Sequence, residues 1–248
     1  MGLKVDIFPA LQDNYGFILQ DEASGRVAII DAPEPRAITE RLSALGLNRL
    51  DYILNTHWHP DHAGGNALLK KRYDAEIYGP HEVTRIAPLD HVLTPGVVFR
   101  LGETVLEVID LGGHTLGHIG YYDRSGGQAF VADTIFPLGC GRLFEGTQEQ
   151  MWGALKRIAE LPDDTILYSA HEYTLSNLKF AESLGADLAL SERGAKIRVM
   201  RERGEATVPS TVAEEKATNP FLVYPLQEKD FAAQAAKFGE LRRAKDQF

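Results

Sequence analysis

The sequence has very little cysteine: Cys140 is the one thiol among 248 residues. A single cysteine excludes an internal disulfide framework and is typical of a protein kept in a reducing cytoplasm. No neighbouring basic residue clearly lowers the pKa of this thiol. We therefore expect Cys140 to be a small buried apolar side chain rather than a nucleophile.

Long apolar runs and an excess of basic residues are also missing. No stretch is apolar enough to span a membrane, and the amino-terminal residues 1–9 lack the basic start and apolar core of a signal peptide. The formal net charge of -9 argues against nucleic acid or an anionic membrane as a partner, since both need a basic face. We expect a cytoplasmic, monomeric protein whose partner is a small molecule.

The most informative stretch that is present is 56–65, Thr-His-Trp-His-Pro-Asp-His-Ala-Gly-Gly. It follows an apolar run, 50–55, that predicts a buried strand, and it precedes a predicted helix over 66–72. Three histidines and an aspartate within six positions have no packing purpose. Imidazole and carboxylate are ligands for zinc, iron or manganese, so the stretch predicts a metal site at the carboxyl end of a strand.

The spacing inside this stretch suggests two metal ions. His57 and His59 lie two residues apart, so in extended backbone they point to the same side. Asp61 and His62 come after Pro60, which we expect to end the strand and turn the chain. These two side chains should then reach a second position.

Further ligand types follow the ends of other predicted strands. Three such residues are His114, Asp133 and His171. The carboxylate of Asp133 has no role in an apolar core but can bridge two cations. Asp31, at the end of another apolar run, is expected to orient a ligand histidine without binding the metal itself. The remaining histidines are expected at the surface or behind the ligands: His81, His91 and His118.

The apolar pattern predicts an α+β fold, with two sheets packed together and helices outside. Glycine pairs and polar turns separate the expected strands, and capping residues and glycines bound the expected helices. The expected strands are 5–8, 16–20, 26–31, 50–55, 75–78, 97–101, 104–109, 119–123, 128–132 and 165–169, and the expected helices are 35–46, 66–72 and 147–161.

After residue 172 the pattern becomes helical throughout, which divides the chain into domains 1–172 and 173–248. Helices are predicted over 175–183, 188–203, a short segment with a capping box at Thr211 and Glu214, and 229–247. In the last helix Arg242 and Lys245 share one side next to an apolar stripe. We expect both cations to be exposed, so that removing them should change stability little.

These motifs together resemble the metallo-β-lactamase superfamily and, more closely, its hydroxyacylglutathione hydrolase (glyoxalase II) family. The resemblance runs nearly end to end, and the Arg-Arg-x-Lys ending of the helical tail narrows it. It implies an αββα sandwich of two mixed sheets with a small helical carboxyl-terminal domain. The stretches that carry it, besides the histidine motif, are Asp13-Asn-Tyr15, Gly113-His-Thr-x-Gly-His118, Gly139-Cys-Gly-Arg142, His171-Glu-Tyr-Thr174, Thr218-Asn-Pro-Phe-Leu222 and Arg242-Arg-Ala-Lys-Asp-Gln-Phe248.

The resemblance also implies a role for each candidate site residue. It implies two divalent ions, most simply Zn²⁺, with Fe or Mn as alternatives. One ion is assigned to His57, His59 and His114 and the other to Asp61, His62 and His171, with Asp133 bridging and with Asp61 and Asp133 as catalytic residues. Glutathione is assigned to Arg142, Tyr173, Arg242 and Lys245. The chain departs from the family at Arg142 and Phe144, where Lys and Tyr are frequent, and at Val223, where Arg is frequent.

The implied activity is hydrolysis of S-(2-hydroxyacyl)glutathione, such as S-D-lactoylglutathione, to a 2-hydroxy acid and glutathione, the second step of methylglyoxal detoxification. An alternative on the same scaffold is a mononuclear iron persulfide dioxygenase or a lactonase. A dioxygenase would use His57, His59 and His114, or a triad including Asp133, and would leave the other ligand set idle. A binding module without catalysis would be expected to have lost ligands, and the sequence lacks none of them.

Overall fold

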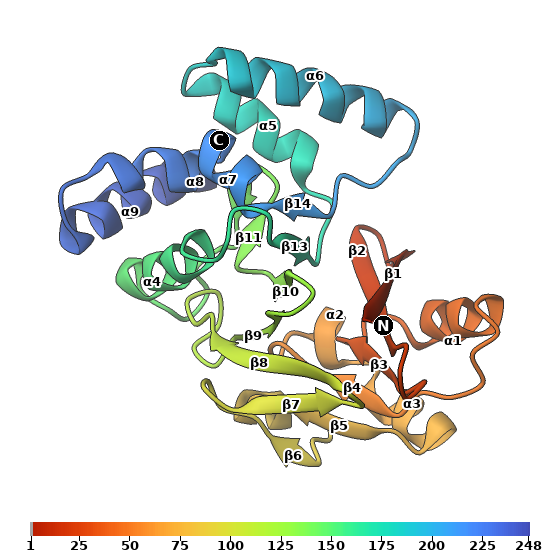
Figure 1. The fold of residues 1–248 in the computed structure, drawn as a ribbon. Helices are drawn as coiled ribbons and strands as arrows, with labels where there is room; N and C mark the ends of the chain where they lie inside the picture. The colour runs from red at the N-terminus through yellow and green to blue at the C-terminus, as the bar shows by residue number, and fades with distance from the viewer. Residues whose placement is uncertain (1) are drawn as a thin grey trace. The chain divides into compact units, whose positions relative to one another are not determined.

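The computed structural model describes residues 2–248, which form two compact units. The first unit comprises the chain up to Asp110 together with Gly117–Phe130. The second unit comprises Leu111–Leu116 and Val131–Phe248. In Figure 1 the first unit is drawn in red to yellow-green and the second largely in green to blue.

A mixed six-stranded sheet forms the frame of the first unit, in the order β1-β2-β3-β4-β5-β6. The first three strands form the predicted antiparallel meander, and β3 to β6 run parallel. Gly25 makes one of its turns with φ +70°, a conformation that glycine adopts without strain. The strands are β1 (Leu3–Ala10), β2 (Asn14–Asp21), β3 (Val27–Ile30), β4 (Tyr52–Leu54), β5 (Glu76–Gly79) and β6 (His91–Val92).

Helices cover one face of this sheet. Ile38 and Leu42 of α1 (Pro35–Ala44) and Leu69 of α3 (Asn66–Tyr73) are fully buried in a core with Ile29, Ile53 and other strand residues. Along the chain, the short α2 (Pro60–Ala63) comes between α1 and α3, and the 3₁₀ turn η1 (His81–Arg85) follows β5. Burial of these side chains supplies the main driving force for the layer.

The opposite face of the first sheet meets a second sheet. The strands β7 (Val98–Leu101), β8 (Thr104–Asp110), β9 (Ile119–Asp123) and β10 (Gln128–Ala132) are antiparallel neighbours. The ring of Phe99 in β7 packs edge-on against Tyr52 of β4 and Tyr78 of β5, with centroids 5.2 and 4.9 Å apart. The first unit is therefore the predicted two-sheet sandwich. The end of β10 lies in the second unit, where β13 (Ile166–Ser169) and β14 (Ser210–Thr211) continue the strand order.

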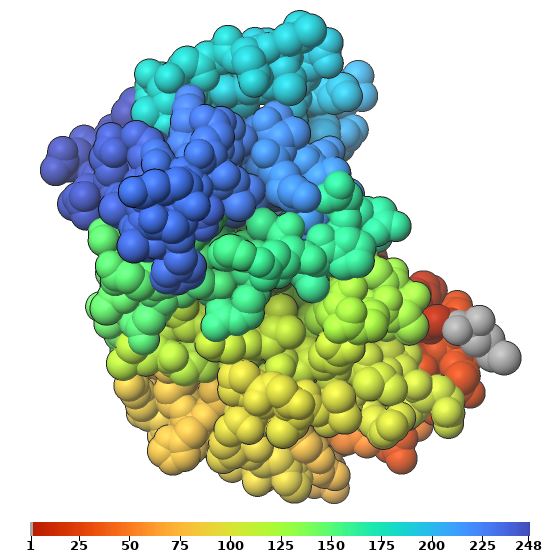
Figure 2. Space-filling view, turned by 60° about the vertical axis from the view of Figure 1, so that its left-hand side comes forward, coloured from red at the N-terminus to blue at the C-terminus, as the bar shows by residue number. Residues whose placement is uncertain are grey.

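The second unit is mostly helical. Trp152 of α4 (Gln148–Ala159) stacks on Phe238 of α9 (Phe231–Gln247) with ring centroids 6.5 Å apart, and its indole N–H donates to Gln234 at 3.2 Å. The two helices are therefore joined by a buried aromatic contact. Figure 2 shows α6 at the surface of this unit. Its elements, besides the strands above, are the hairpin β11 (Ile135–Phe136) and β12 (Gly139–Cys140), the helices α4 (Gln148–Ala159), α5 (Thr174–Ser183), α6 (Leu188–Glu202), α7 (Val212–Thr218), α8 (Pro220–Val223) and α9 (Phe231–Gln247), and the 3₁₀ turn η2 (Pro225–Gln227).

The predicted α+β fold with outer helices and a helical carboxyl-terminal segment is confirmed. Sequence reasoning missed the two-residue strands and α8, because such short elements carry no periodic pattern. It was also wrong about Pro60, which does not end a strand: β4 stops at Leu54, and Pro60 is the first residue of α2. None of the helices in residues 2–248 is long and apolar enough to cross a membrane.

A buried carboxylate at the end of β2 joins two turns of the first unit. Asp21 accepts hydrogen bonds from the backbone N–H and hydroxyl of Ser24, the hydroxyl of Thr104 and the backbone N–H of Glu103. Burial raises the pKa of Asp21, but these hydrogen bonds outweigh burial and lower the pKa to about 2. The turn after β2 is thereby held to the turn between β7 and β8.

We predict that Asp21→Asn lowers the free energy of unfolding at neutral pH by about 1 to 2 kcal/mol, because it weakens several hydrogen bonds to a charged acceptor. Because the folded pKa lies below the ordinary 3.8, the contribution is complete above about pH 4 and is lost as the pH falls towards 2. Urea unfolding across this pH range measures it. Glu103→Gln, which removes an exposed charge next to the same site, is the control. A penalty that does not shrink on acidification would contradict the role of the charge.

Candidate metal centre

The histidine motif runs from the loop after β4 into α2: His57 and His59 lie in the loop, and Asp61 and His62 lie in the helix. His57 and His62 are buried, and His59 and Asp61 are half-buried. His57 Nε2 lies 3.0 Å from His59 Nδ1, and His62 Nε2 lies 3.4 Å from Asp61 Oδ2. Ring nitrogens and a carboxylate oxygen are thus gathered in the segment that follows β4.

These separations suit a metal ion. Ligand atoms held about 2.0 to 2.2 Å from a tetrahedral Zn²⁺ are about 3.3 to 3.6 Å from one another. The pairs in the first unit, at 3.0 and 3.4 Å, are close to this spacing, and their nitrogen and oxygen donors are the types that bind divalent ions. The chain therefore has a divalent metal site.

Asp31 and Thr56 hold the Nδ1 atoms of two motif histidines. We call these the outer nitrogens, because they face away from the other candidate ligands. Asp31, with φ +58°, accepts the Thr56 backbone N–H and hydroxyl and lies 2.8 Å from His62 Nδ1. The Thr56 hydroxyl oxygen is also 3.0 Å from His57 Nδ1. Both rings are thereby fixed with Nε2 as the inner nitrogen. The predicted contact between Asp31 and a motif histidine is confirmed.

Two further residues touch the motif, and sequence reasoning gave no role to the first of them, Asn14. Asn14, the first residue of β2, donates its side-chain amide to Asp61 Oδ2 at 3.0 Å. His118 is fully buried, and its ring stacks on His57 with centroids 4.7 Å apart, so it lies behind a candidate ligand as expected. Both belong to motifs that carry the family resemblance, which was the available signal. His81 is exposed, and His91 stacks on Tyr78 near the surface.

The second unit gathers three further candidate ligands. Asp133 follows β10 directly after Ala132, whose φ is +41°. Asp133 Oδ2 lies 3.3 Å from His114 Nε2, and Asp133 Oδ1 lies 3.3 Å from His171 Nε2. The outer nitrogen of His114 is 2.8 Å from the backbone carbonyl oxygen of Arg142. A buried carboxylate thus offers each of its oxygens to a different imidazole.

The candidate glutathione-binding residues also lie in this unit, but Arg242 is not on an exposed face. Its guanidinium donates to the Cys140 carbonyl at 3.0 Å and to Asp246 at 2.8 Å, and it lies over the Phe221 ring at 5.2 Å. The side chain is 5% exposed, so the prediction that Arg242 is an exposed cation is wrong. The Asp246 carboxylate, the Cys140 carbonyl and the Phe221 ring are the partners that stabilise this charge.

Lys245 is half-buried and lies near other cations. Its ammonium donates to the backbone oxygen and the hydroxyl of Ser176, at 2.9 and 3.2 Å. Burial lowers the pKa of Lys245, and the neighbouring charges of Arg242 and Arg142 lower it further. The charges of Arg242 and Arg142 thus act on Lys245, and the Asp246 carboxylate pairs with Arg242 in the same region.

Aromatic rings and the cysteine complete the surroundings of this site. Tyr173 stacks on His171 with centroids 4.8 Å apart and planes 2° apart, and the exposed Phe144 lies edge-on to His114 at 5.2 Å. Burial raises the pKa of the Cys140 thiol to about 11, which the nearby Arg242 offsets only in part. The prediction that Cys140 is a small buried side chain is confirmed.

The sequence and fold match known proteins over their whole length. The family model for the metallo-beta-lactamase superfamily matches residues 11–171, and that for the hydroxyacylglutathione hydrolase C-terminus matches residues 172–248. Hydroxyacylglutathione hydrolase from Erythrobacter litoralis is 43% identical over 256 residues, covering 99% of this chain and 100% of its own. The corresponding protein from Rhizobium meliloti is 44% identical over 254 residues, covering 99% of both.

A solved structure supports the same fold. The crystal structure of ETHE1 from Myxococcus xanthus has a TM-score of 0.70 at 24% identity, covering 97% of this chain and 91% of its own. At this identity the likeness concerns the fold alone. The resemblance that the sequence motifs indicated is confirmed by the two family models and by the full-length relatives. The chain belongs to the hydroxyacylglutathione hydrolase family of the metallo-beta-lactamase superfamily.

Proposed function

We propose that the protein hydrolyses S-(2-hydroxyacyl)glutathione, such as S-D-lactoylglutathione, to a 2-hydroxy acid and glutathione. The observation that carries this proposal is the full-length match to hydroxyacylglutathione hydrolases, which includes the helical carboxyl-terminal segment. The clusters of histidine and aspartate supply the metal chemistry that such a hydrolysis uses. Within this proposal, residues 1–172 act in catalysis and residues 173–248 in substrate binding, in a cytoplasmic monomer.

Seven side chains are proposed to hold two divalent ions, most simply Zn²⁺, with Fe or Mn as alternatives. The support lies in the spacing of the donor atoms inside each unit and in Asp133, whose two oxygens each face an imidazole. When bound, such ions lower the pKa of a water molecule and polarise the substrate carbonyl. The proposed ligands are His57, His59 and His114 for one ion, Asp61, His62 and His171 for the other, and Asp133 between them.

Other groups of the chain orient these ligands, and the reaction needs no strong general acid. Asp31, Thr56 and the Arg142 carbonyl hold the outer ring nitrogens, so the rings need no reorganisation when the reaction occurs. The leaving group is a thiolate whose conjugate acid has a pKa of about 8.5, so it departs without a strong general acid. A buried Cys140 with a raised pKa is consistent with hydrolysis that uses no protein nucleophile.

Glutathione carries carboxylates, and the cation cluster of the second unit is proposed to bind one of them. Arg142 is exposed, Lys245 is half-buried, and both contribute positive potential to the same region. Buried Arg242 contributes its charge from behind and positions the backbone at Cys140. Tyr173, stacked on His171, is proposed to contact the peptide part of the substrate.

A persulfide dioxygenase or a lactonase on the same scaffold has less support. Neither alternative accounts for the match of residues 172–248 to the hydroxyacylglutathione hydrolase carboxyl-terminal family. A mononuclear site would also leave the contacts among Asp61, His62 and Asp31 without a purpose. The decisive comparison is turnover of S-D-lactoylglutathione, glutathione persulfide, a lactone and a β-lactam by the same purified, metal-loaded preparation.

We predict two divalent ions per chain. Elemental analysis of protein purified without chelator, and again after supplementation with zinc, iron or manganese, gives the stoichiometry. Removal of metal with a chelator should abolish hydrolysis, and re-addition should restore it, because the ions supply the activated water. A stoichiometry of one that supplementation does not raise would rule out the dinuclear assignment.

We predict that Asp133→Ala loses nearly all turnover and binds both ions more weakly, because one carboxylate is proposed to serve both. Circular dichroism checks that the fold is kept, and metal analysis separates loss of an ion from loss of chemistry. Asp110→Ala, in the first unit outside the proposed ligand set, is the matched control. Parental metal content in Asp133→Ala would show that the carboxylate does not bridge.

We predict that Arg142→Ala and Lys245→Ala each raise KM for the glutathione thioester roughly 10- to 150-fold, which corresponds to about 1.5 to 3 kcal/mol for a contact to a carboxylate. A small thioester without the glycyl carboxylate should show no such effect. Arg243→Ala, an exposed cation on the same helix as Lys245, is the matched control. Equal loss for both substrates would indicate a structural role instead.

A further inference from the structure

The hairpin formed by β11 and β12 connects two proposed functional residues of the second unit. Ile135 pairs with Cys140 and Phe136 with Gly139. Asp133 lies two residues before the hairpin, and Arg142 lies two residues after it. Any displacement of this hairpin would therefore be passed along a few bonds to the proposed metal bridge and to the proposed substrate cation.

Two asparagines of the helical segment bind the carbonyl groups at the hairpin turn. Asn177 of α5 donates to the Pro137 oxygen at 3.2 Å. Asn219, the residue before α8, donates to the oxygens of Phe136 and Gly139 at 3.2 and 2.9 Å. Gly139 lets Asn177 come this close, because a Cβ there would lie 2.3 Å from the Asn177 amide nitrogen.

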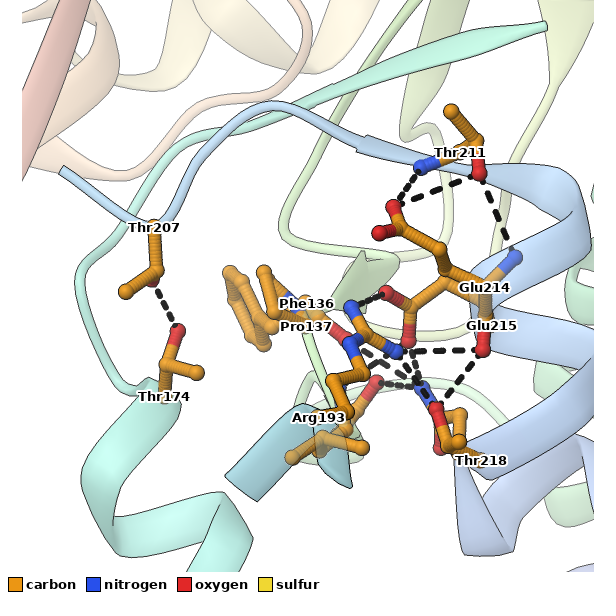
Figure 3. Close-up of polar contacts among 12 residues, drawn as sticks. Phe136, Pro137, Thr174, Arg193, Thr207, Thr211, Glu214, Glu215 and Thr218 are labelled. Carbon is orange, nitrogen blue, oxygen red and sulfur yellow. Dashed lines mark hydrogen bonds and ion pairs between the residues drawn. The ribbon is translucent and has the colours of Figure 1, made fainter. Parts of the chain in front are cut away.

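A buried carboxylate accepts the backbone N–H of Leu138 at the turn of the hairpin. Leu138, with φ +61°, donates its N–H to the carboxylate of Glu215, which is fully buried in α7. Asn219 donates to the same oxygen at 2.9 Å, and Arg193 of α6 pairs with the other oxygen. Figure 3 shows Arg193 and Glu215 pointing toward each other beside the hairpin, with Thr218 next to the guanidinium.

The open end of the hairpin packs directly against the proposed ligands. A Cβ on Gly141 would lie 1.9 Å from the Asp133 carbonyl oxygen and 3.1 Å from His114 Nδ1, so the strand leaves no space between them. The Arg142 carbonyl lies 2.8 Å from the same nitrogen of His114. The hairpin is thus anchored at its turn by helices and in contact at its other end with two proposed ligands.

We propose that the helical segment positions Asp133 and His114 through this hairpin, in addition to binding substrate. Asn177, Glu215 and Asn219 are then positioning residues of the metal centre. The assignment rests on the proposed function only in taking Asp133 and His114 as ligands. Arg193 is half-buried and holds the fully buried Glu215 carboxylate, which accepts hydrogen bonds from the Leu138 N–H and the Asn219 amide. In this proposal the ion pair serves to fix the position of these groups rather than to add stability.

The test compares variants at the turn with a variant that weakens the same helices elsewhere. Asn219→Asp keeps the side-chain acceptor for the Phe221 N–H but replaces the donor to the hairpin with a repelling oxygen. Asn177→Ala is the milder variant and removes one donor. Thr211→Ala is the control, because it breaks the exposed capping box of α7 with Glu214 and leaves the hairpin contacts intact.

Zinc affinity, measured by competition with a chromophoric chelator well below the melting temperature, is the primary readout. The absorption spectrum of the Co²⁺-loaded protein is the second. We expect both asparagine variants to bind zinc about tenfold more weakly or worse and to change the Co²⁺ spectrum, as loss of outer partners does in metal sites. Thr211→Ala should lower the melting temperature and leave zinc affinity and spectrum as in the parent.

Parental zinc affinity and Co²⁺ spectrum in Asn177→Ala and Asn219→Asp would overturn the proposal and leave the network a purely structural one. If Asn219→Asp does not fold, Asn177→Ala decides by the same criteria. A parent protein that binds zinc but does not hydrolyse glutathione thioesters would refute the proposed function alone, since the comparison of affinities does not depend on turnover.

Discussion

Imidazole nitrogens and carboxylate oxygens, all electron-pair donors, lie close together in each of the two units. The surrounding structure holds them there. His57 and His59 meet through ring nitrogens, and Asp133 faces an imidazole with each oxygen. Burying such groups is costly unless each is paired or binds a metal. A divalent cation satisfies several of them at once, which is the physical reason for a fold that brings them together.

The second requirement is that the rings arrive already oriented. Asp31 and Thr56 in the first unit, and the Arg142 carbonyl in the second, take the outer nitrogens. The left-handed backbone of Asp31 and the positive φ of Ala132 before Asp133 are strained conformations for residues with a side chain. Strain at both positions is tolerated where the geometry of a site depends on it.

The helical segment has more roles than its composition suggests. Arg242 is buried against Phe221 and the Cys140 carbonyl, so it stabilises the site from behind as well as contributing charge. Glu215 and Asn219 bind the β11–β12 hairpin, which lies between Asp133 and Arg142 in the sequence. Arg242 and Asn219 thus bind the carbonyls of two neighbouring residues of β12, Cys140 and Gly139, and the helical segment holds this strand from two elements.

The sequence by itself determined the class of fold, the family and the types of ligand. Apolar periodicity located the long strands and helices, and Thr56–Gly65 with the strand-end residues indicated a metal centre, because these signals are local in the chain. Tertiary structure alone decided that Arg242 is buried, that His118 stacks on His57 and that Asn14 binds Asp61. It also decided the hairpin network, since Glu215 and Leu138 lie 77 positions apart. Such contacts depend on which faces meet when the elements pack, and no local pattern records that.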